Sequence, residues 1–233
     1  MRDTACAPGY EGWTPLRYAV VLHDHHLVQR ILEEEKGYVN VNLALTRDYP
    51  ESGHVKGMTI LHTAAAFSTP EVIFQLMRFG ASTKARSRQG FQPLHVAAIS
   101  DKPHTVVAIV EATTRQNRNA LLDDCSNTLN ATPLLIAAKC GSHDCVEELM
   151  KRGVNQGAKD WLGMNALVCA AECERGEVRT IRYLIESQES TFNCNEKMKW
   201  SNVTRSGALM VASAKHFSCA LNSVMGFKLA EDG

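Results

Sequence analysis

Cysteine and histidine are the residues of this sequence best suited to bind a metal or to react. Eight cysteines and nine histidines occur among the 233 residues. Five of these side chains come close together in the chain: Cys140, His143, Cys145, Cys169 and Cys173. Thiolates and imidazoles are the ligands that zinc prefers, but this spacing matches no compact zinc-binding motif. A metal or redox sensor is therefore kept as an alternative function, and no metal ligand is assigned.

A second polar cluster, His23-Asp24-His25-His26, has the side chains of a general base or of a ligand set. It falls between two expected helices, where polar residues are normally solvated. The sequence contains no Gly-rich phosphate loop, no Gly-x-Ser-x-Gly motif and no His-Glu-x-x-His motif. We therefore expect no catalytic residue and no cofactor, and the protein is not expected to be an enzyme.

Charge and hydropathy exclude further classes of function. Twenty-five basic residues balance 25 acidic ones, so no overall positive field attracts nucleic acid or an anionic membrane. The short basic run Lys84, Arg86 and Arg88 is interpreted as a solvated face. No run of about 18 apolar residues is present, which argues against membrane insertion. The first residues lack the apolar core of a secretory signal, so we expect an intracellular protein, cytoplasmic, with the nucleus as the alternative.

One sequence frame recurs along the chain, of the form Gly-x-Thr-Pro-Leu-x-x-Ala. Its five clear copies span residues 12–19, 57–64, 90–97, 130–137 and 163–170, and a degraded sixth copy spans 206–212. The leucines of the six copies are Leu16, Leu61, Leu94, Leu134, Leu167 and Leu209, and two of the intervals between them equal 33 residues. The sequence therefore contains an internal repeat, and this repeat is the main evidence for the fold.

Each copy predicts two short helices, because a second apolar cluster follows its leucine by about one helix and one turn. The first helix opens with Thr-Pro in two copies, at Thr14 and Thr132. Threonine caps free backbone amides, and proline suits the first helical position. In this register Cys169 aligns with Ile136 of the preceding copy, so we interpret it as a small core residue.

These features resemble the ankyrin repeat, whose pattern is Thr-Pro-Leu-His-x-Ala-Ala with a 33-residue period. His62 and His95 keep the histidine of the pattern, and Phe79-Gly80-Ala81 matches the step that follows the second helix. The resemblance implies an all-α ankyrin-repeat solenoid of about six helix-turn-helix units joined by hairpins or fingers. The histidine is replaced in the other copies by Arg17, Leu135, Val168 and Met210.

The resemblance places the whole chain, residues 1–233, in one ankyrin-repeat domain. The expected units lie near residues 10–56, 57–89, 90–129, 130–162 and 163–204, with a degenerate capping unit at 205–233. The three connections that exceed the repeat period, residues 38–56, 113–129 and 187–205, are expected to form surface loops or contact-making fingers.

Partners of ankyrin repeats usually contact the hairpin tips and the exposed side of the first helices. The resemblance carries these places over to the residues around the first position of the frame and after its alanine pair. The expected partner-binding residues are Trp13, Met58, Phe67, Arg88, Gln89, Phe91, Lys139, Trp161, Leu162, Met164 and Glu172. Aromatic anchors are typical of interface hot spots. Burial of the same rings between neighbouring fingers is the alternative.

The sequence thus predicts a monomeric protein-interaction module, a scaffold, adaptor or regulatory domain that binds another protein and not nucleic acid. One alternative is a regulatory or targeting segment of a larger protein, such as a kinase, a channel or a secreted effector. The other is the Cys/His sensor.

Overall fold

The chain folds into a row of helix pairs. The computed structural model describes residues 13–34, 38–49, 53–126, 130–173 and 178–189. The paired helices, in chain order, are α1 (Pro15–Val21) and α2 (His25–Glu34), α3 (Ile60–Phe67) and α4 (Pro70–Arg78), α5 (Pro93–Ile99) and α6 (Pro103–Ala112), α8 (Pro133–Cys140) and α9 (His143–Lys151), and α10 (Ala166–Ala171) and α11 (Val178–Glu189). No strand occurs among these described residues, which confirms the all-α prediction.

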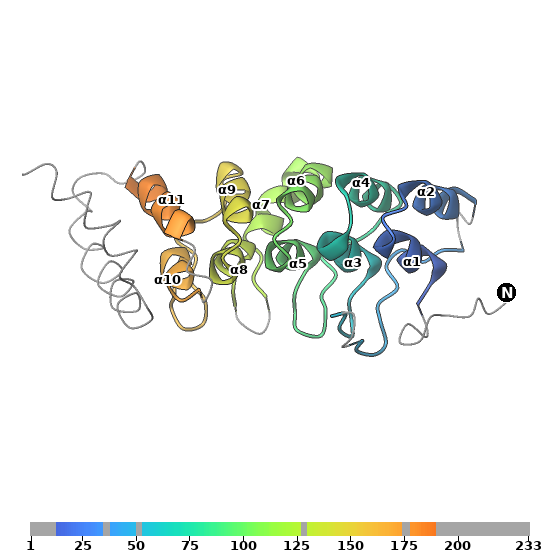
Figure 1. Cartoon of the computed structure of the whole chain (residues 1–233), viewed down its shortest axis with the longest axis horizontal. Helices are drawn as coiled ribbons and strands as arrows, with labels where there is room; N and C mark the ends of the chain where they lie inside the picture. Colours follow the sequence, from blue (N-terminus) through green and yellow to red (C-terminus); the bar gives the residue numbers. More distant parts are fainter. Residues whose placement is uncertain (1–12, 35–37, 50–52, 127–129, 174–177, 190–233) are drawn as a thin grey trace, which may run out of the picture.

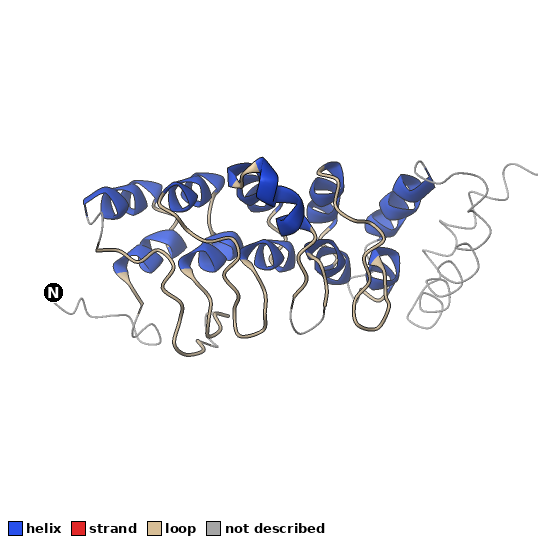
Figure 2. Ribbon diagram, turned by 180° about the vertical axis from the view of Figure 1, so that it is seen from behind, coloured by secondary structure: helices blue, strands red, loops and turns tan. Residues whose placement is uncertain are grey.

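The first helices of the pairs form one layer and the second helices form another (Figure 1). Helices α1, α3, α5, α8 and α10 lie side by side in the inner layer, and α2, α4, α6, α9 and α11 pack beside one another in the outer layer. Four connections project from the inner layer, side by side along one edge (Figure 2). We name them, within the described residues, finger A (38–58), finger B (81–92), finger C (123–132) and finger D (154–165).

Local sequence determines where the inner helices begin. The Thr14 hydroxyl accepts a hydrogen bond from the Arg17 amide at 3.3 Å, and the Thr132 hydroxyl accepts one from the Leu135 amide at 3.4 Å. A proline follows each threonine at the first helical position. These caps satisfy amides that the helix itself leaves without partners.

The core follows the repeat. The frame leucines Leu16, Leu61, Leu94, Leu134 and Leu167 are buried, as are the alanine pairs that follow Leu61, Leu94, Leu134 and Leu167. Alanine lets neighbouring helices approach closely, so each unit packs mainly on the units beside it. Cys169 is buried in the same layer, which confirms its interpretation as a core residue.

A helix occupies part of the 113–129 connection, which the sequence predicts to be a loop. Helix α7 (Arg115–Leu122) extends the unit on the side that faces the viewer in Figure 2. Among residues 116–122 of this helix, whose burial the structure describes, only Leu121 and Leu122 are buried. Two apolar residues at one end make no helical period, so the prediction of an irregular connection is wrong here.

The C-terminal part of the expected layout is not tested by this structure. The capping unit at 205–233, the frame copy at 206–212 and most of the 187–205 connection lie outside the described residues. The division of the chain into one domain of six units therefore stays a prediction. None of the described helices has the length and apolarity of a membrane span.

The first position of the frame turns each finger back toward its helix. Gly57, Gly90, Asn130 and Gly163 have φ values of 85°, 79°, 48° and 77°. Glycine reaches this left-handed region freely, and asparagine is among the residues that tolerate it best, which explains the replacement at Asn130. At Gly57 the absence of a side chain has a second use, because a Cβ atom there would lie 2.8 Å from the Arg88 amide nitrogen. That amide donates to the Lys56 carbonyl at 2.8 Å and joins finger B to finger A.

We predict that Gly57→Ala destabilises the fold more than Gly80→Ala does. Both glycines have φ values of 85°, but a Cβ atom at Gly80 would meet no atom within 4 Å. Strain at positive φ is common to both variants, whereas the clash with finger B is confined to Gly57. We expect the free energy of unfolding of Gly57→Ala to be lower than that of Gly80→Ala by about 2 kcal/mol. Urea unfolding of both variants measures the difference, and equal losses would contradict the close approach of the fingers.

Candidate interaction surface

A buried side chain in each of the first three units binds the base of the next finger. In the second unit this residue is His62. Its Nε2 lies 2.9 Å from the Phe91 carbonyl oxygen, and its Nδ1 lies 3.0 Å from the Thr59 amide nitrogen. A carbonyl oxygen only accepts, so Nε2 carries the proton and Nδ1 accepts from the Thr59 amide. The neutral ring thus caps its own helix and holds finger B.

His95 repeats this arrangement one unit further along. Its Nε2 lies 3.2 Å from the Ala131 carbonyl oxygen in finger C, and its Nδ1 accepts from the Gln92 amide at 3.3 Å. Burial lowers the pKa of both His62 and His95 to about 4, because the charged form would lose its hydration. Both imidazoles are therefore neutral at pH 7 in the folded chain.

Arg17 takes the place of the histidine in the first unit and makes the same connection. It donates to the Met58 carbonyl at 3.2 Å, and Met58 corresponds in the repeat to Phe91 and Ala131. The guanidinium also donates to the Leu43 carbonyl at 3.3 Å and to the Thr63 hydroxyl at 3.0 Å. Burial lowers the pKa of Arg17 to about 10. The replacement of histidine by Arg17 therefore keeps the hydrogen bond to the finger and adds two further hydrogen bonds.

In the fourth unit the frame residue makes no hydrogen bond to the next finger through its side chain. Leu135 holds the same position, is buried and has no polar side-chain atom to donate. The corresponding carbonyl, that of Met164, accepts from the Asp160 amide of its own finger at 3.0 Å, as the Phe91 carbonyl does from the Ser87 amide at 2.9 Å. Among the described units, the polar link to the next finger is thus confined to the N-terminal three.

Two of the expected partner-binding residues are part of the core. Trp13 is 5% exposed, and Met58 is also buried. The Trp13 ring packs edge-on against Tyr49 and His54 of finger A, with ring centroids 5.9 and 4.8 Å away, and Arg17 lies over it at 5.9 Å. For these two residues the alternative of burial against a neighbouring finger holds, because finger A folds back over them.

The other expected residues reach the surface to different extents. Phe67, Arg88, Gln89, Lys139, Trp161 and Leu162 are exposed, and Phe91, Met164 and Glu172 are half-buried. Trp161, at the end of finger D, is 65% exposed. Phe67 lies at the end of α3 and stacks on His54 at 5.2 Å while keeping 42% of its surface exposed. Binding by these residues stays a prediction.

Sequence reasoning missed two exposed apolar residues on the inner layer. Leu22 follows α1 and is 69% exposed, and Ile99 is the exposed last residue of α5. Both lie just beyond the position of the alanine pair, in the register that led to Phe67. The register alone would have found them, because it places the same end of every inner helix on the same face.

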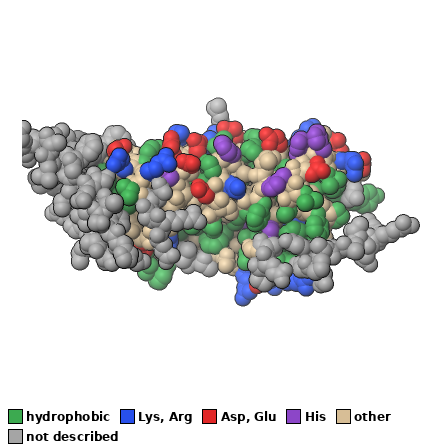
Figure 3. Space-filling view, viewed as in Figure 1, with side chains coloured by type: hydrophobic (Ala, Val, Ile, Leu, Met, Phe, Trp, Pro, Cys, Tyr) green, Lys and Arg blue, Asp and Glu red, His purple; other side chains and the backbone are tan. Residues whose placement is uncertain are grey.

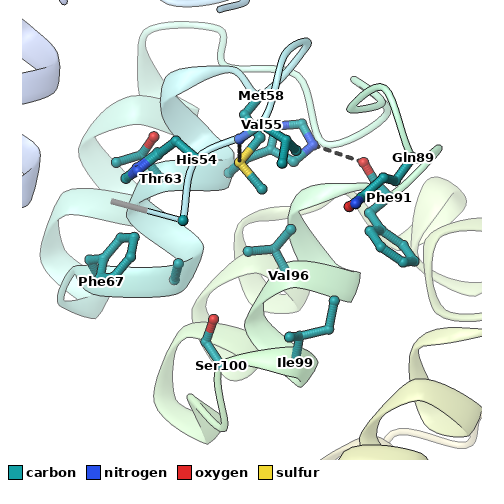
Figure 4. A pocket seen from close by; sticks show the side chains of 13 residues that line it. His54, Val55, Met58, Thr63, Phe67, Gln89, Phe91, Val96, Ile99 and Ser100 are labelled. Carbon is teal, nitrogen blue, oxygen red and sulfur yellow. Dashed lines mark hydrogen bonds between the residues drawn. The ribbon is translucent and has the colours of Figure 1, made fainter. Parts of the chain in front are cut away.

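A cavity of about 250 Å³ lies between fingers A and B and the ends of α3 and α5 (Figure 4). Its walls include Val55, Met58, Phe67, Phe91, Val96 and Ile99. The link from His62 to the Phe91 carbonyl spans it, and the Val55 amide donates to the Met58 sulfur at 3.4 Å. The cavity wall is therefore mostly apolar and is held by hydrogen bonds that start in the core.

Cys145 and Cys169 have the properties of core residues. Burial raises the pKa of both Cys145 and Cys169 to about 12. Such thiols stay protonated at neutral pH, and the thiolate is the form that reacts and binds metals.

A different group of three, His143, Asp144 and Glu147, has ligand atoms within 4.8 Å of one another at the start of α9. The Glu147 carboxylate is bound there to the Lys151 ammonium at 2.9 Å, and the His143 Nδ1 lies 3.3 Å from the Thr180 hydroxyl. Both groups thus have protein partners.

Stacked helix pairs with fingers along one edge, joined by a buried frame residue, define the ankyrin-repeat fold. The chain has the ankyrin-repeat fold. The family model for ankyrin repeats in three copies matches residues 108–198. A crystal structure of the human ASB11 ankyrin repeat domain superposes with a TM-score of 0.58 and 21% identity, over 75% of this chain and 69% of that domain. Ankyrin repeats are a general protein–protein interaction module, and members of the family are generally not enzymes.

Two curated relatives show how this segment sits in longer proteins. The mouse ankyrin and armadillo repeat-containing protein is 28% identical over 176 residues, which are 76% of this chain and 11% of that protein. The human neurogenic locus notch homolog protein 4 is 34% identical over 94 residues, 40% of this chain and 4% of that protein. The chain thus spans only a small part of these relatives' length.

We predict that the fold loses stability as the pH falls from 6.5 to 4. Unfolded histidine binds a proton near pH 6.5, whereas folded His62 and His95 bind one only near pH 4. Between these values the unfolded chain holds more protons, so acid favours unfolding. The full loss is on the order of 3 kcal/mol for each histidine. Urea unfolding at a series of pH values measures it.

The matched control for this measurement is the double variant His62→Leu, His95→Leu, which copies the residue found at Leu135. The variant is expected to be less stable than the unaltered chain at pH 7, but its free energy of unfolding is expected to change less between pH 6.5 and 5. A slope equal to that of the unaltered chain would show that the two imidazoles do not cause the pH dependence.

Proposed function

We propose that this chain binds another protein through the inner-helix face and the finger ends, and that it acts as a scaffold, adaptor or regulatory domain without catalysing a reaction. The proposal is supported by one observation above all. Leu22, Phe67 and Ile99 are exposed apolar residues, each at one of the two positions that follow the alanine pair or its equivalent Ala19-Val20, in three successive units. Such a row on a soluble domain is typical of a surface that a partner covers.

The surface of the N-terminal units supports this proposal. Figure 3 shows hydrophobic side chains gathered below the helices of the N-terminal units, above the ends of the fingers. In the later units the position equivalent to Ile99 holds Lys139 and Glu172. The apolar N-terminal part is the proposed main contact, and Trp161 with Leu162 on finger D provides a second apolar contact. Stacked units hold both in fixed positions, so little conformational entropy is lost on binding.

Several properties of the module belong to the same proposal. We propose that it acts as a monomer in the cytoplasm or nucleus and binds a protein rather than nucleic acid, a choice supported by the balanced charge of the chain. A regulatory or targeting role inside a larger protein is the second candidate. It is favoured by the curated relatives, in which the matching segment is 11% or less of the length.

We predict that Phe67→Ala weakens partner capture and that Phe74→Ala does not. Both rings are 42% exposed, but Phe67 lies on inner helix α3 and Phe74 on outer helix α4. Loss of a hot-spot ring lowers binding by about tenfold or more. Quantitative mass spectrometry of proteins captured by each variant measures the effect, with melting temperatures as the check on folding.

A protein retained by Phe74→Ala and lost with Phe67→Ala would be the expected partner. Equal capture by both variants, together with unchanged capture by the double variant Trp161→Ala, Leu162→Ala, would show that neither the inner-helix face nor finger D is the binding surface.

A further inference from the structure

The cavity between fingers A and B has the size of a site for one side chain. Its volume is about 250 Å³, whereas pockets for cofactors and other small molecules begin near 300 Å³. The wall is formed by apolar residues of both fingers and both inner helices: Val55, Met58, Ala66, Phe67, Phe91, Val96 and Ile99. A bulky apolar side chain that enters here would leave water without requiring a polar partner.

Basic residues flank this cavity. Lys56 and Arg88 each stand next to a wall residue, and the hydrogen bond from the Arg88 amide to the Lys56 carbonyl, 2.8 Å, brings their backbones together. Asp48 binds the Arg88 guanidinium at 3.2 Å and uses its other carboxylate oxygen for the Lys56 amide. Within the residues that the structure describes, the Lys56 ammonium makes no ion pair, so a positive charge is left beside the cavity.

The excess of positive charge extends over both fingers. The described parts of fingers A and B contain five basic residues and one acidic residue: Arg47, Lys56, Lys84, Arg86 and Arg88, against Asp48. One of the five, Arg86, is bound to Asp124 of finger C at 2.6 Å. Figure 3 shows lysine and arginine side chains at the lower edge of the molecule, where the fingers end. The chain as a whole is neutral, so this charge is a local property of the binding edge.

We propose that the cavity takes one bulky apolar side chain from an acidic segment of a partner protein, with the carboxylates of that segment beside Lys56 and Arg88. The proposal rests on the function proposed above and names the chemistry of the partner. An apolar anchor fits the wall, and acidic neighbours complement the charge of the fingers. A basic segment would place like charges together at the same edge and would be rejected.

A random library of short peptides, selected on the full chain, tests this proposal without knowledge of the natural partner. The enriched peptides are expected to share one large apolar residue with acidic residues next to it. Synthetic copies of the best peptide are then measured by fluorescence anisotropy, beside copies in which the anchor is alanine or the acidic residues are amides. Each change is expected to weaken binding by about tenfold, and added salt is expected to weaken only the acidic peptide.

Variants of the chain locate the site. Ala66→Phe fills the cavity and is expected to abolish binding of the best peptide. Ser100→Trp, at another position of the cavity wall, replaces it if Ala66→Phe does not fold. Lys56→Glu is expected to weaken binding about tenfold. Arg30→Glu, which makes the same charge change on outer helix α2, is its matched control and is expected to have no effect.

Each other outcome overturns a stated part of the proposal. Enrichment of basic peptides, or binding unaffected by the cavity variants, would show that the segment or the site is wrong, and no enrichment at all would contradict the proposal outright. The proposed function would survive these results if capture still depended on Phe67. Self-association that Ala66→Phe abolishes, seen by sedimentation, would show instead that a second copy of this chain occupies the cavity.

Discussion

The hydrogen bond between a buried frame residue and a carbonyl at the base of the next finger is the interaction on which the N-terminal three units of this structure depend. Each of these carbonyls also accepts an amide of its own finger, so the group that would lack a partner without this hydrogen bond is the buried Nε2–H of His62 or His95, at a cost of about 1–3 kcal/mol. Arg17 and the two histidines provide the donor in three successive units. Since helices in a solenoid contact only their neighbours, this bond also fixes where each finger stands relative to the helix before it.

The position of the fingers in turn determines the surface. His62 lines the cavity and holds the Phe91 carbonyl on its far wall, while the Lys56 carbonyl holds finger B to finger A from the other side. The apolar part of the inner face and the hydrogen bonds from the frame residue to the next finger therefore occupy the same three units. Where Leu135 and Val168 replace the donor, the position equivalent to Ile99 is charged, with Lys139 in one unit and Glu172 in the next.

Local signals in the sequence were sufficient to predict the helices but not the paths of the fingers that connect them. Thr132, Pro133 and the frame leucines act within one helix and its neighbours, so the repeat predicted the layers. The burial of Trp13 depends on Tyr49 and His54, which a long finger brings back across the chain. The alignment of the repeats cannot predict where such a finger runs, because its inserted residues have no counterpart in the other copies. For the same reason the sequence could place Phe67 on a face and could not show that a cavity opens beside it.

The arginine of the first unit shows why a departure from a repeat pattern need not be a loss of function. A repeat pattern records residue types, whereas the link to finger A needs only a donor that reaches the Met58 carbonyl. Arg17 satisfies that requirement with a longer side chain and reaches two further acceptors, Leu43 and Thr63. It stays charged at neutral pH because even its lowered pKa is about 10, whereas a protonated His62 would turn its acceptor Nδ1 into a donor facing the Thr59 amide. The first inter-unit link is therefore insensitive to mild acid, and the next two are the points where acid acts on the finger spacing.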